Sequence, residues 1–454
     1  MSKIERCETI LEHFGKIFAK RRHCDGAAGG SGSVIRGFES MSARPADHIT
    51  RAAVFLLDPG WGGPADSQLM SDTRIGFGLF LAPFHAMGES PTLSLERDLE
   101  LISWVDTLGY DEAWVGEHHS SGWETIASPE LFLAVAAERT RHIRLGTGAV
   151  SLPYHHPLMV ADRIVLLDHL TRGRINFGVG PGGHISDALM LGLDPAVLRD
   201  RMAESLEIIV RLMTQTEPIS AQSEWFTLVD AVLQLRPYQH PTPPLAVTSM
   251  ESPAGMRLAG RLGAGVLSLT VAKATGGSVD LRAQWAEAEH SAEAAGTRVD
   301  RRDWRLVIPV HIAETRRQAI DQTREGGARH MLEYVEATTG RPCPVRGPRE
   351  KIVEQMAELG AWVIGTPDDL VAALTRLRQM SGGFGTVLFW GHEWAPFDAV
   401  KRSHELIARY VVPQFNGALE GITASNAIVR AESARLHELR NDATAKAKTA
   451  PPRS

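Results

Sequence analysis

The stretch Tyr-Asp-Glu-Ala-Trp-Val-Gly-Glu-His-His at residues 110–119 contains a short apolar strand that ends abruptly in Glu117, His118 and His119. In barrels built from parallel strands, catalytic groups stand on the loops that follow the strands. This stretch therefore predicts one edge of an active site, provided that the rest of the chain consists of repeated strand–helix units.

Such units run through the chain from residue 74 onward. Apolar runs typical of buried parallel strands alternate with segments in which apolar residues recur at helical spacing. Eight units favour closure into a (β/α)8 TIM barrel over an open doubly wound sheet. We expect strands at residues 74–81, 112–116, 143–148, 174–179, 244–249, 264–269, 304–311 and 385–390, and helices at 93–108, 129–140, 157–170, 199–214 and 253–261.

Two intervals are longer than simple connections between elements. Residues 215–243 contain Trp225, Phe226 and an Arg-Pro-Tyr turn, which predict an inserted hairpin over the barrel mouth. Residues 325–365 are rich in Gly and Pro between 338 and 348, which predicts a long loop that serves as a lid. The expected fold is a TIM barrel with insertions at its C-terminal mouth.

The two ends of the chain differ from the barrel region, which we place at residues 74–416. Residues 1–73 combine a basic first segment with a Gly-Ala-Ala-Gly-Gly-Ser-Gly-Ser run and no sustained periodicity, so we expect disorder there. Met70 is an alternative start, in which case the extension before it is no part of the enzyme. Residues 417–454 predict a polar helical tail that is partly disordered.

The composition of the 454 residues, 43% hydrophobic and 22% charged, is ordinary for a globular enzyme. A formal charge of -6 without a concentrated basic face argues against nucleic acid as a partner. Three cysteines cannot make a disulfide framework, and neither a membrane-spanning apolar run nor a secretory signal is visible. We therefore expect a cytoplasmic protein that binds neither nucleic acid nor membrane.

The histidines at the ends of strands are candidates for proton transfer, because the pKa of imidazole lies near neutrality. His118 is the main candidate, and the alternative is a histidine held by neighbouring carboxylates for structural reasons. Metal binding is disfavoured, since adjacent positions do not direct both imidazoles of His118 and His119 to one ion. His155 and His156 after the third strand are weaker candidates, which line the pocket or cap the next helix.

The run Gly-Val-Gly-Pro-Gly-Gly at 178–183 matches a dinucleotide fingerprint, but it follows the fourth strand and no acidic strand end comes about 20 residues later. Its glycines either form a turn or bring backbone N–H groups close to a cofactor. Arg199 can reach the same face with a guanidinium suited to phosphate. Glu251 and Ser252 close the fifth strand, where Ser252 either caps the next helix or completes an anion site.

Together these residues resemble the bacterial luciferase-like flavin-dependent monooxygenase family over about residues 74–415, and the limonene monooxygenase-type members most of all. The matching motifs occur in the family's order, which makes the resemblance specific. They are Phe-Gly-Leu-Phe-Leu-Ala-Pro-Phe-His at 77–85, Asp-Glu-Ala-Trp-Val-Gly-Glu-His-His at 111–119, Ile-Arg-Leu-Gly-Thr-Gly at 143–148, Leu-Leu-Asp-His-Leu-Thr-Arg-Gly-Arg at 166–174 and Phe-Gly-Val-Gly-Pro-Gly at 177–182.

The resemblance implies that reduced FMN binds at the C-terminal mouth and activates O2, and that a separate NAD(P)H-dependent flavin reductase supplies it. It also implies a homodimer. His118 matches the family's catalytic histidine, and Pro181 stands where luminescent members carry a basic residue, so we do not expect light emission. The implied cofactor-binding residues are Gly148 and Ala149 at a backbone bend that is often a cis peptide, Gly180, Arg199, Glu251 and Ser252.

The expected reaction is oxygenation of an apolar organic substrate, first a terpene-like alkene and next a ketone. Two alternatives remain open from the sequence: a deazaflavin-dependent oxidoreductase of the same fold that transfers hydride, and a flavin-binding protein without catalysis. Five aromatic residues are candidates for the substrate pocket, although aromatic side chains also pack barrels. They are Phe84, Trp123, Trp225, Phe226 and Trp390.

Overall fold

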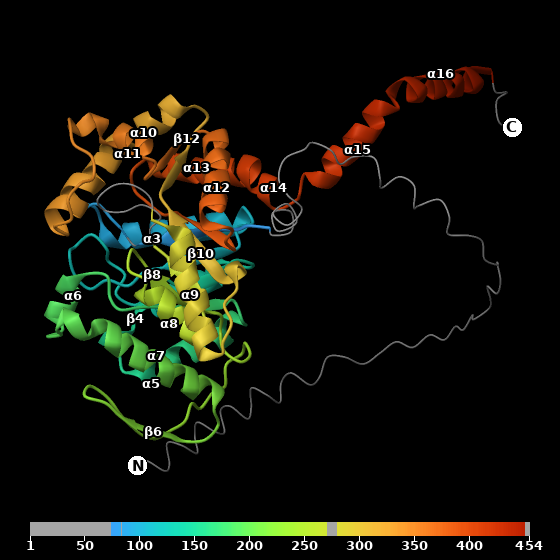
Figure 1. Ribbon diagram of the computed structural model, residues 1–454. Helices are drawn as coiled ribbons and strands as arrows, with labels where there is room; N and C mark the ends of the chain where they lie inside the picture. Colours follow the sequence, from blue (N-terminus) through green and yellow to red (C-terminus); the bar gives the residue numbers. More distant parts are fainter. Residues whose placement is uncertain (1–73, 83, 270–278, 450–454) are drawn as a thin grey trace, which may run out of the picture. The chain divides into compact units, whose positions relative to one another are not determined.

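The computed structural model describes residues 74–82, 84–269 and 279–449. Eight parallel strands pair side by side, and the pairing of β3 with β5 closes them into a barrel (Figure 1). All eight predicted strands are present, so the (β/α)8 TIM-barrel prediction is confirmed. The strands are β1 (Gly76–Leu81), β2 (Glu112–Val115), β3 (Arg144–Thr147), β5 (Ile175–Gly180), β8 (Leu245–Ser249), β9 (Gly265–Ser268), β10 (Trp304–Ile308) and β13 (Thr386–Trp390).

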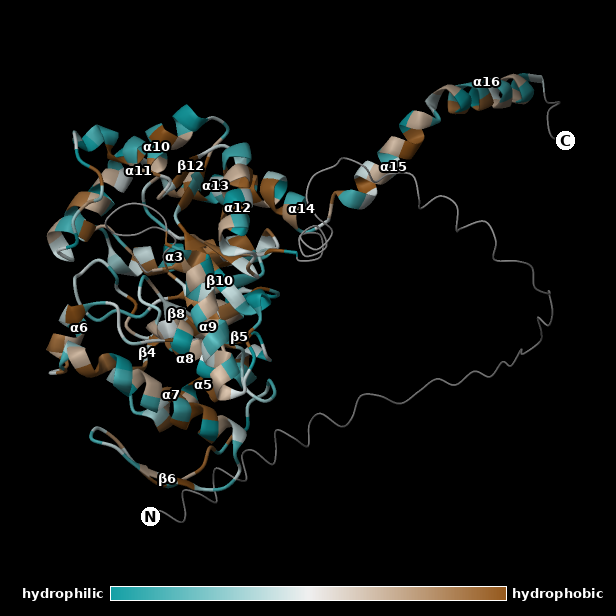
Figure 2. Cartoon of the chain, viewed as in Figure 1, coloured by the Kyte–Doolittle hydropathy of each residue, from teal (hydrophilic) through white to brown (hydrophobic). Residues whose placement is uncertain are grey.

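Helices cover the outside of the barrel, and α5, α7, α8 and α9 are visible there in Figure 1. Several of them begin with proline, whose fixed φ suits the first helical turn and whose missing N–H costs no hydrogen bond there. In Figure 2 the strands are mostly hydrophobic, while the helices also carry hydrophilic residues. The helices are α3 (Pro91–Thr107), α4 (Pro129–Arg139), α5 (Pro157–Thr171), α7 (Leu198–Thr214), α8 (Ala254–Leu262), α9 (Leu281–Ala295), α12 (Pro367–Ser381) and α13 (Phe397–Leu406).

The interior of the barrel is closed beneath its mouth by Trp114, which is fully buried. Its Nε1 donates to Glu112 at 2.8 Å, and the same carboxylate accepts two hydrogen bonds from Arg305, both at 2.8 Å. A Cβ on Gly146 would lie 2.4 Å from the Trp114 ring, so the indole requires glycine at that position. A charged pair buried this deeply is kept by its complete hydrogen bonding, and it lies at the N-terminal ends of β2 and β10, below Trp114.

The chain bends sharply after β3, at a cis peptide bond between Gly148 and Ala149. The two residues that follow form a short strand, β4 (Val150–Ser151), which pairs with the end of β5. The bend implied by the family resemblance is thus present, and it carries the backbone of Gly148 and Ala149 across the mouth.

The predicted hairpin is present as β6 (Ile219–Gln222) and β7 (Thr227–Ala231), but its predicted place was wrong. Trp225 at its tip donates to Glu204 of α7 at 2.8 Å, and Arg236 after it bonds carbonyls at the end of α7. A helix that follows a strand returns to the opposite end of the barrel, so a segment after α7 starts far from the mouth. The hairpin therefore packs along the outside of α7.

The predicted lid is also not one long loop. It contains the end of α10 (Arg316–Arg329), a π-helical segment at His330–Thr338, α11 (Ile352–Glu358) and β12 (Val363–Gly365), which pairs with β11 (Val310–Ile312). These elements lie together in Figure 1 and share an apolar core with Trp362 and Trp394. The glycines and prolines of residues 338–348 marked only the loop between the two helical parts.

Helices α15 (Glu420–Ala431) and α16 (Ser433–Thr449) expose all of their side chains to solvent. The division into regions at residues 74 and 417 stays a prediction, and residues 1–73 lie outside the described part. Within the described residues, no helix has the length and apolar character needed to cross a membrane.

Candidate active site

Two adjoining cavities open at the C-terminal ends of the strands. The first, which we call the cationic cavity, has a volume of about 430 Å³ and is lined by Gly148, Ala149 and Gly180 together with Arg199, Arg257 and Arg261. The second, the aromatic cavity, has about 550 Å³ and is lined mainly by Phe80, Trp362, Trp390, Met250, Met331 and Tyr334. His118 lines both cavities, as do Gly148, Arg199 and Ser252. The mouth therefore joins a compartment with three arginines to one with aromatic walls, and His118 lines both.

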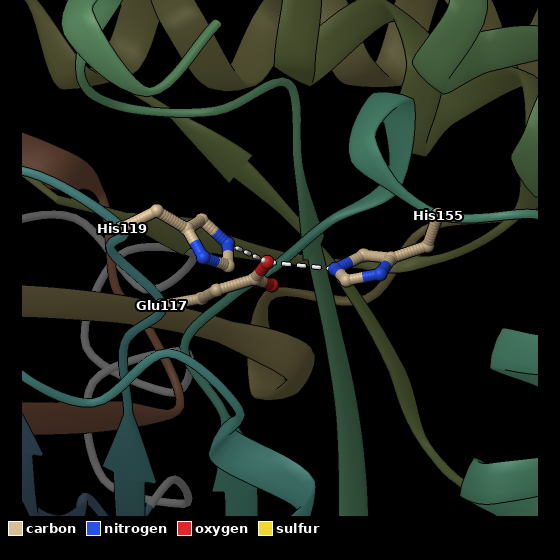
Figure 3. A group of neighbouring side chains, drawn as sticks. All are labelled: Glu117, His119 and His155. Atoms are coloured by element: carbon tan, nitrogen blue, oxygen red, sulfur yellow. Dashed lines mark hydrogen bonds and ion pairs between the residues drawn. The ribbon is translucent and has the colours of Figure 1, made fainter. Parts of the chain in front are cut away.

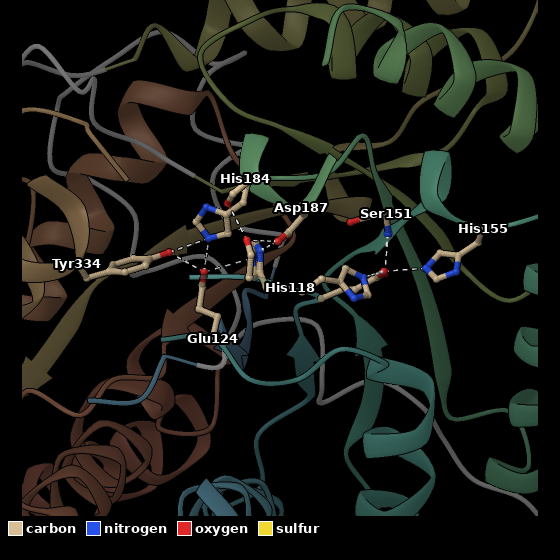
Figure 4. A network of polar contacts seen from close by, with 11 residues as sticks. His118, Glu124, Ser151, His155, His184, Asp187 and Tyr334 are labelled. Atoms are coloured by element: carbon tan, nitrogen blue, oxygen red, sulfur yellow. Dashed lines mark hydrogen bonds and ion pairs between the residues drawn. The ribbon is translucent and has the colours of Figure 1, made fainter. Parts of the chain in front are cut away.

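His118 lies between two carboxylates, at the positions shown in Figure 4. Its Nε2 is 3.5 Å from Glu124 Oε2, and its Nδ1 is 3.4 Å from Asp187 Oδ2. Both distances are too long for strong hydrogen bonds. Burial opposes protonation, but the charges of Glu124 and Asp187 outweigh it, so the pKa of His118 is raised. The imidazole is thus favoured in its protonated form while neither nitrogen is tightly bonded.

Glu124 is buried and accepts hydrogen bonds from two distant segments. Its Oε2 accepts hydrogen bonds from His184 Nε2 and from the Tyr334 hydroxyl, both at 2.5 Å. Burial alone would raise the pKa of Glu124, but His118, His184 and Tyr334 lower it. The carboxylate therefore stays ionised beside His118.

Glu117 forms a separate network on the other side of the same loop (Figure 3). Its Oε1 accepts from His119 Nε2 at 2.8 Å and from His155 Nε2 at 2.7 Å, and its Oε2 accepts from the backbone N–H of Ser151 at 2.8 Å. Burial would raise the pKa of Glu117, but these hydrogen bonds lower it to about 2. This network ties the loop after β2 to β4.

The same two networks are the places where the described residues could hold a metal ion. Glu117, His119 and His155 offer ligand atoms within 4.8 Å of one another, and so do His118, Glu124 and His184. Nitrogen and oxygen ligands of one tetrahedral zinc ion stand about 3.3 Å apart, given bonds of about 2.0 Å. The contacts of 2.5–2.8 Å are those of hydrogen bonds, so the expectation of no metal stays a prediction.

The glycines of 178–183 serve different purposes. A Cβ on Gly178 would lie 2.0 Å from the carbonyl oxygen of Thr147, so this glycine is required by strand packing. Gly180 faces the cationic cavity, and a Cβ there would lie 2.9 Å from Thr248 Oγ1. Gly182 has a φ of 97°, which favours glycine. Turn formation thus accounts for Gly182, while contact of the Gly180 backbone with a cofactor stays a prediction.

The cationic cavity contains a free positive charge. Arg199, in the first turn of α7, makes no hydrogen bond or ion pair within the described part of the chain, whereas Arg257 pairs with Glu287 at 2.8 Å and Arg261 with Glu207 at 3.7 Å. Ser252 accepts weakly from the backbone N–H of Ala254 at 3.3 Å. An unpaired guanidinium near a helix start is suited to an anionic group.

With this geometry, the comparison with known proteins is informative. The model of the luciferase-like monooxygenase family matches residues 75–382. The chain belongs to this family. It is 52% identical over 363 residues to the 4-hydroxyprotoasukamycin monooxygenase of Streptomyces nodosus subsp. asukaensis, which covers 80% of this chain and 98% of that protein.

Two further members of the luciferase-like family extend the comparison. Limonene 1,2-monooxygenase of Rhodococcus erythropolis is 45% identical over 347 residues, covering 76% of this chain and 88% of that protein. The oxygenating constituent of 3,6-diketocamphane monooxygenase from Pseudomonas putida, a type II Baeyer–Villiger enzyme solved with FMN, superposes with a TM-score of 0.64 at 24% identity, covering 76% and 99% of the two chains. The chain is accordingly an oxidoreductase of the monooxygenase type, with the fold of these relatives.

The family motifs predicted residues that line the cationic cavity, but they did not predict the polar residues around His118. The predicted Gly148, Ala149, Gly180, Arg199 and Ser252 all line the cationic cavity, and Glu251 lines the aromatic cavity. Four polar residues around His118 and two arginines were missed. Only the two arginines could have been found from the sequence, because they lie four positions apart on a predicted helix. The missed residues are Glu124, His184, Asp187, Tyr334, Arg257 and Arg261.

Among the aromatic candidates, only Trp390 lines the aromatic cavity. Phe84 and Trp123 stack on each other at 5.3 Å behind Tyr334, where they support the cavity wall. Trp225 and Phe226 belong to the hairpin outside α7, so their prediction as pocket residues was wrong.

Proposed function

We propose that this protein is a flavin-dependent monooxygenase that uses reduced FMN and O2 to oxygenate an apolar organic substrate. The observation that carries the proposal is the position of His118, which lies where a glycine-lined cationic cavity meets an aromatic one. A cofactor with a phosphate and a flat ring would occupy the cationic cavity, and an apolar substrate the aromatic one. The two molecules would meet at His118.

The residues of the cationic cavity fit FMN. Arg199 offers an unpaired charge for the phosphate, and Ser252 precedes the N-terminus of α8. The backbone at Gly148, Ala149 and Gly180 lines the cavity, where a flat ring could lie against it. Glu251 would contact the ring from the neighbouring compartment. When bound, reduced flavin supplies the electrons that activate O2.

His118 would hold and deliver a proton at Nε2. Glu124 and Asp187 keep the imidazole in its charged form, and neither carboxylate binds it tightly. General acid–base catalysis of this kind requires a group within reach of the reacting atoms and a pKa near the working pH. His118 lines both cavities, which places it beside the proposed sites of cofactor and substrate.

The aromatic cavity would hold the substrate and exclude water. Trp362, Trp390, Met331 and Met356 form its walls, and Pro342 and Pro344 of the loop at 339–348 close one side. Apolar walls favour an apolar organic molecule, for which a terpene-like alkene is our first candidate and a ketone the second. Exclusion of water protects reactive species from unproductive protonation.

Electrons would come from a partner protein. We propose that an NAD(P)H-dependent flavin reductase releases reduced FMN, which diffuses to the cationic cavity, and that the enzyme acts as a homodimer in the cytoplasm. Size-exclusion chromatography with light scattering checks the dimer. Supplying photoreduced FMN in place of the reductase and NAD(P)H checks whether reduced flavin alone is sufficient for oxygenation.

The decisive experiment mixes purified protein and photoreduced FMN with ¹⁸O₂-containing buffer and limonene. We expect slower flavin oxidation than in free solution and a product that carries one ¹⁸O atom, detected by gas chromatography and mass spectrometry. A camphor-type ketone is tested in parallel. Flavin oxidation that matches free solution, together with tight binding of the deazaflavin F420, would replace the proposal by deazaflavin-dependent hydride transfer.

A further inference from the structure

A single oxygen atom, Oε2 of Glu124, is approached by three groups. His184 Nε2 and the Tyr334 hydroxyl each lie 2.5 Å from it, while His118 Nε2 is 3.5 Å away. A carboxylate oxygen has two lone-pair directions. Both are used by the two short hydrogen bonds, so the third donor is left at a distance (Figure 4).

Tyr334 belongs to the insertion, whereas Glu124 and His118 belong to the loop after β2. The tyrosine lies in the middle of the π-helical segment His330–Thr338, and π-helical turns occur frequently at functional sites. The segment contacts that loop at a further point, where Trp123 Nε1 donates to Thr338 Oγ1 at 3.1 Å, and the Tyr334 ring packs on Phe84 of the loop after β1 at 5.1 Å. Its docking places the hydroxyl on Glu124.

We propose that Tyr334 is a positioning residue whose hydroxyl occupies Glu124 Oε2 and thereby keeps that oxygen, which faces His118, from accepting the His118 Nε2 proton directly. The proposal deepens the proposed function, because it rests on His118 as the proton donor. With Tyr334 in place, Glu124 stabilises the charge of His118 across 3.5 Å while the Nε2 proton stays available to the cavities.

Several charged and titratable groups surround His118. Among the carboxylates, Glu124 is the one that accepts a hydrogen bond from the insertion. Asp187 faces Nδ1 from α6 (Ile185–Met190) and is held by Ser120, while Glu117 is engaged by His119 and His155. His184 lies 4.3 Å away, ring to ring, and Arg199 and Arg341 line the aromatic cavity with His118. Of these groups, Tyr334 and Arg341 come from the insertion.

Without the Tyr334 hydroxyl, one lone pair of Glu124 Oε2 would be free to accept from His118. A direct hydrogen bond between opposite charges holds the proton more tightly. The hydroxyl therefore leaves the His118 proton available to the cavities.

The test compares Tyr334→Phe with the matched control Thr338→Val, which removes a different polar contact of the same segment. Both variants keep the bulk of the side chain, and circular dichroism and thermal melting verify that they are folded. Hydrogen–deuterium exchange at the imidazole carbon between the two nitrogens, followed by peptide mass spectrometry across pH, reports the proton affinity of His118 without flavin or substrate.

We expect the exchange midpoint of His118 to rise by about half a pH unit in Tyr334→Phe and to stay at the wild-type value in Thr338→Val. An unchanged midpoint in Tyr334→Phe, or an equal rise in both variants, would overturn the proposal, since the hydroxyl would then have no specific role. Because this readout needs no turnover, a protein that shows the shift but does not oxygenate limonene would contradict the proposed function alone.

Discussion

The loop after β2 presents two buried carboxylates, Glu117 and Glu124, and each of them faces two histidines. Glu117 binds both of its imidazoles within 2.8 Å and uses its other oxygen for the Ser151 N–H. Glu124 binds His184 tightly but leaves His118 at 3.5 Å. The two carboxylates differ in their other hydrogen-bond donors. The Tyr334 hydroxyl of the insertion binds Glu124, whereas within the described residues no comparable side-chain donor displaces a histidine from Glu117.

We call the Glu117 network the clamp, because it holds the loop in place, and the Glu124 network the working site, because it contains the candidate catalytic histidine. In the Glu117 network every strong donor is paired, so the network holds the loop and β4 in place. In the Glu124 network one imidazole, that of His118, has a raised pKa, is loosely held and lines both cavities. Histidines that are adjacent in the sequence, His118 and His119, thus have different surroundings because they point to different carboxylates.

The largest expected effect contrasts these two histidines. His118→Ala should lower turnover with reduced FMN by about a hundredfold or more, the usual contribution of a positioned acid or base, and leave FMN affinity nearly unchanged. His119→Ala should lower turnover less than about tenfold. Equal losses of turnover and FMN affinity in His118→Ala would show that His118 binds the cofactor and would remove the contrast.

The next effect concerns the stability contributed by Glu117. Its pKa is about 2 in the folded protein, against an ordinary value of 4.5. Because the folded pKa is depressed, the contribution is present above pH 4.5 and is lost as the pH falls through about 2. We expect Glu117→Gln to lower the free energy of unfolding by about 3 kcal/mol at pH 7.

The measurement is urea unfolding of both proteins between pH 7 and pH 2.5, with the difference in unfolding free energy plotted against pH. The two curves should approach each other in the acid range. A constant difference at all pH values would mean that the carboxylate charge contributes nothing and that only the shape of the side chain matters.

A smaller effect tests the electrostatic role of Glu124. The charge of Glu124 raises the pKa of His118, so Glu124→Gln should lower it. We expect the limb of the pH–rate profile that requires protonated His118 to move down by about one pH unit. Activity would then be lost at a lower pH than in the wild type, and an unmoved limb would assign that limb to another group.

The smallest effect is predicted for His155→Ala, which removes one of three donors from Glu117. We expect a loss of about 1 kcal/mol in the free energy of unfolding, with the pH–rate profile unchanged. A shifted profile would show that the Glu117 network also takes part in proton transfer, and the distinction between clamp and working site would fail.

Local patterns were sufficient for the barrel and for the motif side of the mouth. Apolar runs of strand length predicted all eight strands, and the motifs around residues 118, 148 and 180 mark strand ends that parallel pairing brings to one edge. The patterns failed for the hairpin, because alternating residues around Trp225 and Phe226 predict a hairpin without its position. They failed for residues 325–365, where Gly and Pro of one loop concealed helices on both sides.

By itself, the sequence determined the closed parallel barrel, the family and the chain positions of His118, Arg199 and Ser252, since each depends on residues close together in the chain. The tertiary structure alone decided which carboxylate each histidine faces and that Tyr334 competes for Glu124. The contact of Tyr334 with Glu124 joins residues 210 positions apart, and those of His184 with Glu124 and of His155 with Glu117 join residues 60 and 38 positions apart, so no local periodicity records them. The contact of Tyr334 with Glu124 forms only because the insertion packs on the barrel. There, three donors surround Glu124 Oε2, which has two lone pairs.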